Sequence, residues 1–314
     1  MKYIITFLAM TSIGMPQNGN LSGVVHYNYN YDFTKDATNE NTGFELTRVY
    51  LTYTQDISEV LSYKFQTDIN SSASPKEVYI KNAKVDWKLP IGKLTIGLQG
   101  MNVFNVTEKT WGFRFIEKSP MDLHQFSSSA DMGIGFSGGL SIVNYSLMIT
   151  NGSGYKESEN DKYKKISTQF VYGEKKLVQN DGYNIGLAYT IESYDVDVAT
   201  TKSKTVMGVF CGYASNGLRL GGEFDTHTDS GTKITQQIMA VYASYKLSDT
   251  MEGLIYYDMY DPDTNTEKNS ENYVIAGLNY YPTKGLVITP NIRLTTPETG
   301  DGTTHAGINF QFKF

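Results

Sequence analysis

Three basic side chains recur at matching places in three consecutive segments of alternating sequence. Arg48, Lys64 and Lys84 each lie near the middle of a segment in which every second residue is apolar or aromatic, and each belongs to the polar half. Successive side chains of a strand point to opposite faces, so these three would stand side by side on one face of a sheet. Clustered positive charges on the wall of an aqueous passage attract anions. The chemistry that this trio offers is therefore anion attraction.

Two acidic side chains occupy comparable places much later in the chain. Glu223 and Asp258 lie near the middle of the segments 217–227 and 251–260, again in the polar half. If the sheet closes on itself, a basic wall would face an acidic wall. A transverse field of this kind orders water and orients dipolar solutes as they pass. The alternative is that these charges only keep the interior wet.

The alternation that positions these residues extends along the whole chain. About sixteen segments alternate between apolar and polar residues, and Gly, Pro, Asn, Asp and Ser separate them. The predicted strands cover residues 20–33, 43–54, 58–69, 77–89, 92–101, 128–138, 140–150, 165–174, 183–193, 204–213, 217–227, 235–246, 251–260, 272–281, 286–295 and 304–314.

Short and long connections alternate between these strands. The long polar connections lie near 34–42, 70–76, 102–127, 151–163, 194–203, 228–234, 261–271 and 296–303. A transmembrane barrel of the outer-membrane type needs short periplasmic turns and longer outside loops, whereas a soluble sandwich has no reason to alternate in this way. We therefore predict an all-β fold, a transmembrane antiparallel β-barrel of about 16 strands, with both chain ends on the periplasmic side. A closed barrel of this size satisfies its backbone in lipid and leaves an aqueous interior.

Composition is compatible with this fold. The chain has 314 residues, with 24 Tyr, 29 Gly, 8 Pro and a net charge of −6, and its mean hydropathy is −0.35. No stretch approaches the roughly 18 apolar residues of a membrane-spanning helix, but in a barrel only every second strand residue faces lipid. The same composition also suits a soluble β-sandwich. The lone Cys211 excludes an internal disulfide and is interpreted as a spectator.

The amino terminus has the features of an export signal. Lys2 precedes a short apolar run, and Ser12 and Gly14 are small residues with the spacing of a cleavage site. We expect residues 1–14 to be a signal peptide and residues 20–314 to form a single barrel domain. The alternative is that the apolar run forms a first strand.

The longest connection, residues 102–127, is also the richest in aromatic residues. A loop this apolar needs a surface to pack on, and the nearest one is the inside of the barrel wall. We therefore expect it to fold inward and narrow the passage, with Lys109, Arg114 and Lys118 lining the constriction and Glu117 as a pairing partner. The alternative is an outside loop that packs against a neighbouring subunit.

The last strand ends in three aromatic residues of one parity, Phe310, Phe312 and Phe314. This pattern resembles the C-terminal signature of Gram-negative outer-membrane barrels. The resemblance implies that the barrel-assembly machinery reads these residues as an assembly signal.

Two stretches in the first 120 residues resemble the phosphate-selective porin O and P family. They are Phe44–Leu51 with Leu61–Gln66, which are similar to an early hairpin, and Lys81–Trp87 with Phe115–Pro120, which are similar to the next strand and an inner loop. The resemblance implies a homotrimeric porin of sixteen strands with an inward third loop. Asp68 and Asp86 interrupt the basic wall, so we expect a mild anion preference or a general pore rather than phosphate specificity.

Other functions lack support in the sequence. A barrel enzyme would need Ser, His and an orienting acid together, and His26, His124, His227 and His305 fall in no such cluster. A plugged adhesin or structural barrel is the other alternative, but this length contains no separate plug. No cofactor, metal or nucleic acid is expected, because the sequence has no phosphate loop or dinucleotide fingerprint and Asp261–Asn265 lacks the glycine of a calcium loop. The prediction is an outer-membrane diffusion channel for ions and small hydrophilic solutes, in contact with lipid.

Overall fold

The computed structural model describes residues 19–34, 36–38, 42–159 and 161–314. The signal peptide predicted for residues 1–14 lies outside these ranges. Among the described residues, no helix is both long and apolar enough to cross a bilayer.

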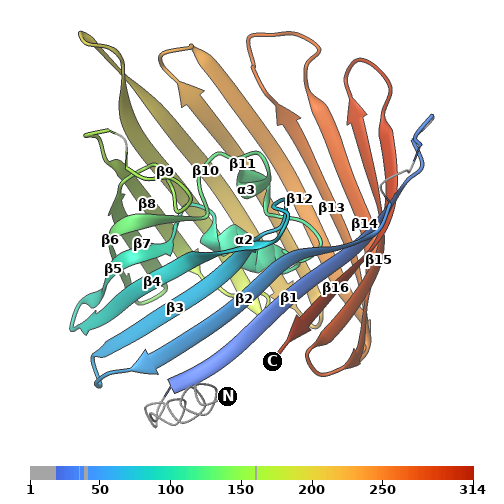
Figure 1. The fold of residues 1–314 in the computed structure, drawn as a ribbon, viewed down its shortest axis with the longest axis horizontal. Helices are drawn as coiled ribbons and strands as arrows, with labels where there is room; N and C mark the ends of the chain where they lie inside the picture. Colours follow the sequence, from blue (N-terminus) through green and yellow to red (C-terminus); the bar gives the residue numbers. More distant parts are fainter. Residues whose placement is uncertain (1–18, 35, 39–41, 160) are drawn as a thin grey trace, which may run out of the picture.

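The described residues form sixteen antiparallel strands in one closed barrel, and β1 pairs with β16 to complete it (Figure 1). Each strand otherwise pairs with its neighbours in sequence. The strands are β1 Gly19–Asp32, β2 Phe44–Asp56, β3 Leu61–Asn70, β4 Glu77–Leu89, β5 Gly92–Gly100, β6 Ala130–Leu140, β7 Val143–Thr150, β8 Lys165–Gly173, β9 Gly182–Asp197, β10 Thr200–Ser215, β11 Leu218–Asp229, β12 Ile234–Ser248, β13 Met251–Asp261, β14 Glu271–Thr283, β15 Leu286–Pro297 and β16 Thr303–Lys313. The predicted fold class is confirmed.

Alternation along each strand separates an outer face from an inner face. In β9, Tyr183, Ile185 and Leu187 are exposed on the outside, whereas Asn184 and Thr190 are buried. In a bilayer the outer row would contact lipid, because a closed barrel leaves no unpaired edge for the backbone.

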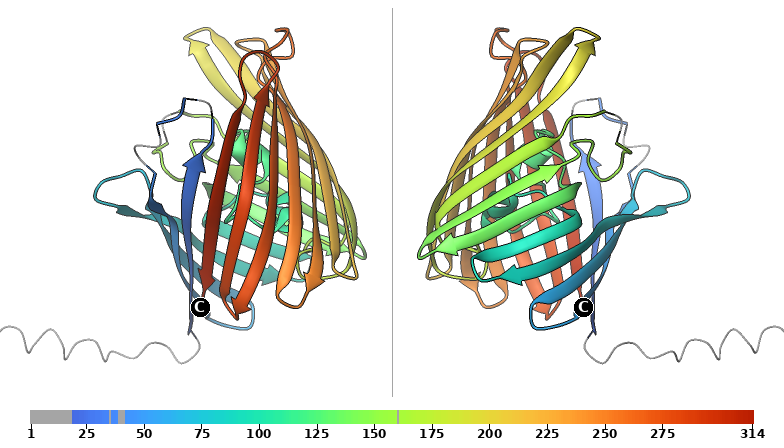
Figure 2. Two further views of the ribbon diagram at one scale, coloured as in Figure 1. Left: turned by 90° about the vertical axis from the view of Figure 1, so that its right-hand side faces the viewer. Right: turned by 90° about the vertical axis from the view of Figure 1, so that its left-hand side faces the viewer.

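One predicted loop is mostly strand. Residues 194–203 were expected to form a long polar connection, but β9 runs to Asp197 and β10 begins at Thr200. The paired hairpin is one of the long hairpins at the upper rim, drawn in yellow at the top of Figure 2. Its residues are polar because they lie in water on both faces, and this polarity resembles that of a loop.

A bulge in β4 changes which side chains face inward. The register with β3 passes from Gln66 opposite Asn82 to Thr67 opposite Ile80, so that Lys81 is the extra residue. Both Lys81 and Asn82 are buried as a result. A strict period of two would have turned Lys81 outward, and a bulge of one residue re-aims a side chain in this way.

The terminal residue closes the barrel against β1. The backbone of Phe314 exchanges two hydrogen bonds with Gly23, with N···O distances of 3.0 and 3.1 Å. The Phe314 ring lies directly over Gly23, where any side chain would collide with it. The aromatic ring at the chain end and the glycine in β1 thus extend the pairing of β1 with β16 by one residue.

Removing Phe314 is expected to lower the yield of folded barrel, because both closing hydrogen bonds and the ring contact are lost. The folded fraction can be measured from the heat-modifiable mobility of the protein in gel electrophoresis. Phe314→Leu keeps the backbone bonds and serves as the matched control. It should fold in detergent, but it should assemble poorly in cells if the aromatic ring is the assembly signal. Equal assembly of Phe314→Leu and the wild type in cells would contradict that role.

Candidate functional site

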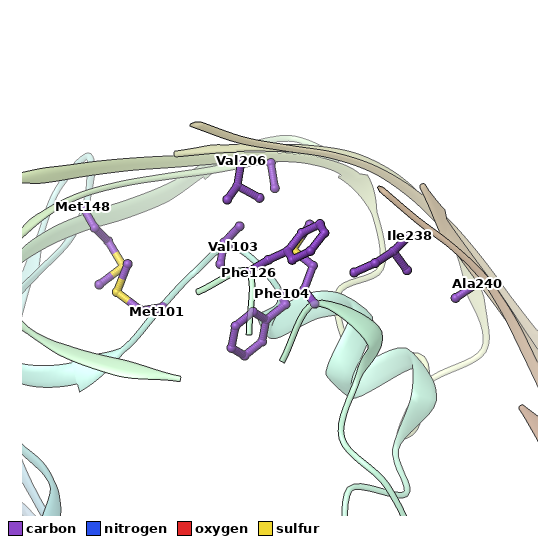
Figure 3. Close-up of a cluster of buried hydrophobic side chains, with 10 residues drawn as sticks. Met101, Val103, Phe104, Phe126, Met148, Val206, Ile238 and Ala240 are labelled. Carbon is purple, nitrogen blue, oxygen red and sulfur yellow. The ribbon is translucent and has the colours of Figure 1, made fainter. Parts of the chain in front are cut away.

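The 102–127 segment packs on side chains of the barrel wall that belong to the buried face. It contains two short helices, α2 Asn105–Trp111 and α3 Pro120–Leu123, which contact β10, β11 and β12. Both helices lie within the barrel outline in Figures 1 and 2. Figure 3 shows one apolar cluster that joins the segment to the wall, made of Met101, Val103, Phe104, Met121 and Phe126 with Met148, Ala188, Val206, Ile238 and Ala240.

A second, aromatic cluster is centred on Trp111. Its ring lies 5.7 Å from the ring of Tyr242 and 5.1 Å from that of Tyr256, and the indole N–H donates to the carbonyl of Glu117 at 2.9 Å. Burial of large aromatic side chains supplies most of the packing free energy of a contact like this. A third, smaller cluster joins Val106 of α2 to Val171 and Phe210, so three apolar clusters hold the segment to the wall.

Polar contacts fix the two sides of the segment. At its start, Asn102 donates to Ser146 Oγ at 2.8 Å, and Gln169 donates to the Asn102 carbonyl at 2.7 Å. Further along, Arg293 of β15 donates to the Ile116 carbonyl at 2.8 Å and pairs with Glu117 at 3.4 Å. The segment thus contacts the inner side of β7 and of the later strands, and cavities remain on both sides of it.

A cavity of about 520 Å³ lies between the segment and the strands β2 to β7. The only carboxylate among its described lining residues is that of Glu108, whereas the basic side chains that line it are Lys64, Lys81, Lys84, Lys93, Lys109 and Arg114.

Two smaller cavities continue this space toward the two rims. One, of about 280 Å³, shares Arg114 with it and reaches Ser71 in an outside loop. The other, of about 250 Å³, shares Lys64 and Lys84 and reaches Asp56 at a short turn. Three neighbouring cavities are therefore distributed from the outside loops to the short turns, and the residues that they share are basic.

Carboxylates neutralise some of these cations. Lys84 and Lys93 both pair with Asp86, at 2.9 and 3.3 Å, and Arg48 pairs with Asp68 at 3.4 Å. Arg114 pairs with Glu108 at 2.6 Å and also with Asp122. The remaining charge of the lining depends on the lysines outside these pairs.

Three lining lysines make no ion pair with any described residue. They are Lys64, Lys81 and Lys109. Burial, with Lys175 and Lys176 nearby, lowers the pKa of the Lys109 ammonium. Because none of these three ammonium groups has a carboxylate partner among the described residues, the lining of the passage carries a surplus of positive charge.

The structure corrects the expected acidic wall. Glu223 is 4% exposed and Asp258 is 0% exposed, and neither lines the passage. The 102–127 segment covers this part of the wall, where Asp258 accepts hydrogen bonds from Tyr256 at 2.7 Å and from His124 at 3.2 Å. The 102–127 segment therefore lies between the basic wall and these two acids, and the basic wall does not face an acidic wall across water.

The structure places the predicted loop residues beside cavities but pairs them differently from the expectation. Lys109 and Arg114 line the main cavity, and Lys118 and Arg48 line the outer one. Glu117 was expected to pair with the loop cations, but it pairs with Arg293 and accepts a hydrogen bond from Tyr273 at 2.9 Å. Arg114 instead pairs with Glu108 of α2 and Asp122 of α3.

Three residues of the site were not singled out from the sequence. Lys93 lies on the inward alternation of its strand, so its parity could have identified it. Lys81 faces inward only because of the bulge, and Arg293 matters only through its contacts with the segment. No group of three or more His, Cys, Asp or Glu in the described parts of the chain is placed to hold a metal ion.

Comparisons with solved structures show the same fold. An anion-selective porin from Comamonas acidovorans is 13% identical, with a TM-score of 0.73, and the match covers 94% of this chain and 99% of that one. Salmonella typhi OmpF in complex with daunomycin is 14% identical, with a TM-score of 0.71 and coverage of 95% and 98%. A trimer form of OmpT from Vibrio cholerae is 12% identical, with a TM-score of 0.65 and coverage of 94% and 99%.

The sequence profile described as phosphate-selective porin O and P matches residues 20–209, which is more than half of the chain. No curated protein sequence matches. The predicted resemblance is thus confirmed, and it extends beyond the first 120 residues. Together with the closed barrel, this match shows a passive diffusion channel of the bacterial outer membrane. The chain belongs to the phosphate-selective porin O and P family.

Proposed function

We propose that the channel prefers anions and that they pass between the 102–127 segment and the strands β2 to β7. The observation that carries this proposal is the set of three lining lysines without an ion pair, Lys64, Lys81 and Lys109. An ammonium without a carboxylate partner raises the local concentration of anions and lowers that of cations. The 102–127 segment narrows this passage because it packs on the opposite wall, where cavities of about 410 and 610 Å³ remain beside it.

The preference is expected to be mild. Asp86 offsets one of the two charges of Lys84 and Lys93, and Asp68 offsets that of Arg48. Chloride and small carboxylates or phosphates are then the solutes that fit the charge of the passage. Arg114 adds little free positive charge to the passage, because two carboxylates pair with it. Its main effect is to hold the two helices of the segment together.

We further propose that the working unit is a homotrimer in outer-membrane lipid, assembled by the barrel-assembly machinery. A trimer form of the Vibrio cholerae OmpT, which shares the fold, supports the trimer. The terminal Phe314 and its closure against Gly23 support recognition of the last strand during assembly.

The test is purified protein in a planar lipid bilayer, with conductance and reversal potential recorded across a KCl gradient. Stepwise conductance with a reversal potential on the anion side is the expected result. A potential on the cation side would overturn the anion preference. Absence of any conductance from protein that is folded by heat-modifiable mobility would overturn the open passage itself.

A further inference from the structure

The outside loop that follows β7 contains a pair of glycines where it approaches the passage. Gly152 and Gly154 have φ values of +100° and +81°, which favour glycine, and a side chain at Gly152 would collide with Glu192. The Gly152 N–H donates to the buried carboxylate of Asp131 at 2.6 Å. The loop after β7 is therefore bent inward where it begins, and Tyr155 is the next residue.

Tyr155 covers the Lys81 ammonium. The Lys81 Nζ atom lies 3.4 Å from the centre of the Tyr155 ring and also donates a hydrogen bond to Ser129 Oγ. The ring of Tyr79 packs beside Tyr155 at 5.6 Å. An aromatic face binds a cation without cancelling its charge, whereas a carboxylate would cancel it. Lys81 is thus fixed in place, 4% exposed, and still charged toward the cavity that it lines.

We propose that Lys81 determines selectivity at the outer part of the passage and that Tyr155 is the positioning residue that holds it there. The loop 151–164 then contributes to solute choice together with the 102–127 segment. This inference rests on the proposed function, since it requires anions to pass through the cavity that Lys81 lines.

The Tyr155 hydroxyl gives the pair a pH dependence. Although burial raises the pKa of Tyr155, the adjacent Lys81, together with Tyr79 and Lys156, outweighs burial and lowers that pKa below the ordinary value of 10.0. Ionisation as pH rises would place a phenolate on Lys81 and neutralise it, so anion preference should fall on the alkaline side. The charged and titratable groups around the pair are Tyr79, Asp68, Arg48, Arg114, Lys156 and Asp131.

Reversal potentials in a KCl gradient, recorded from neutral to alkaline pH, test the proposal. Lys81→Gln should lower the ratio of anion to cation permeability about two- to fivefold at neutral pH, as expected for loss of one unpaired lining charge. Lys162→Gln removes the same charge from an exposed position on the same loop and should leave the ratio unchanged. If Lys81→Gln behaves like Lys162→Gln, the selectivity role is wrong.

Two changes at Tyr155 separate positioning from general structure. Tyr155→Phe keeps the ring and should retain the neutral ratio, but it removes the phenol that titrates against Lys81, so its alkaline decline should differ from that of the wild type. Tyr155→Ala should lower the ratio at neutral pH because Lys81 is no longer held. Equal pH profiles for Tyr155→Phe and the wild type would overturn the pH dependence, and a wild-type ratio in Tyr155→Ala would overturn the positioning role.

The failure of this inference can be told from failure of the proposed function. If Lys64→Glu with Lys84→Glu moves the reversal potential but Lys81→Gln does not, only the role of Lys81 fails. If neither change moves it, anions do not pass along this wall and the proposed function fails. Each variant is first checked for heat-modifiable mobility, so that loss of folding is not mistaken for loss of selectivity.

Discussion

Replacing Lys64 and Lys84 together by glutamate is expected to move the reversal potential from the anion side to the cation side. The two side chains face each other across β3 and β4 and line both the main cavity and the one below it. The exchange takes the local charge from +2 to −2. A unit charge about 7 Å from a permeating ion contributes roughly 0.6 kcal/mol in bulk water, and more at the lower effective dielectric near a protein. Because about 1.4 kcal/mol corresponds to a tenfold ratio, a change of roughly tenfold or more in relative permeability follows.

The control for this exchange is Lys162→Glu with Lys164→Glu, which makes the same charge change on an outside loop. Lys162 pairs with Asp195 in solvent, and neither lysine lines the cavities of the passage. Salt screens charges of this kind over a Debye length of about 10 Å at 0.1 M. An equal effect of the two double variants would show that the selectivity lies in the outer surface rather than in the passage.

Trp111→Ala is expected to loosen the 102–127 segment and raise both the conductance and its fluctuation. Trp111 is 1% exposed and packs on Tyr242, Tyr256 and Phe113. Truncation of a buried tryptophan costs about 3–5 kcal/mol, and here the loss falls on the contact between the segment and the wall. The strands keep their backbone pairing, so the barrel itself should remain folded. Single-channel recording measures both quantities, and tryptic cleavage after Arg114 or Lys118 reports release of the segment.

The other tryptophan is a matched control. Trp87 lies on the outer face of β4 and is 46% exposed in the isolated barrel. Trp87→Ala should change neither conductance nor cleavage of the segment. If Trp111→Ala leaves both unchanged as well, the segment is not what narrows the passage.

The strands could be predicted from the sequence because membrane barrels impose a period of two on every strand. All sixteen predicted segments coincide with strands within a few residues, and inward residues such as Lys64 and Lys84 followed from parity alone. The parity of Lys81 could not be predicted, because a bulge depends on the register with the neighbouring strand and has no local signature here. For this reason Lys81 could not be assigned to the pore wall from the sequence.

The contacts of the 102–127 segment could not be predicted for a different reason. Its aromatic composition indicated that it packs on a surface, but not on which part of the wall. Glu223 and Asp258 were placed on the correct face, yet their exposure depends on which arc the segment covers. Arg293, almost 180 residues away in sequence, is one of the groups that decide this. Long-range packing of a loop is set by complementarity that no periodicity encodes.

Because the 102–127 segment is anchored to the wall from β7 to β15, much of that arc is two layers thick, whereas β2 to β6 are a single layer that faces the main cavity. The packing that anchors the segment and the charged side chains that select solutes thus lie in different halves of the barrel. Charged side chains on the single-layer arc, which is the thin arc, can be replaced, reversed or removed without disturbing the apolar clusters that hold the segment. The thin arc is accordingly the half to redesign for a different solute, and the thick arc is the half to leave untouched.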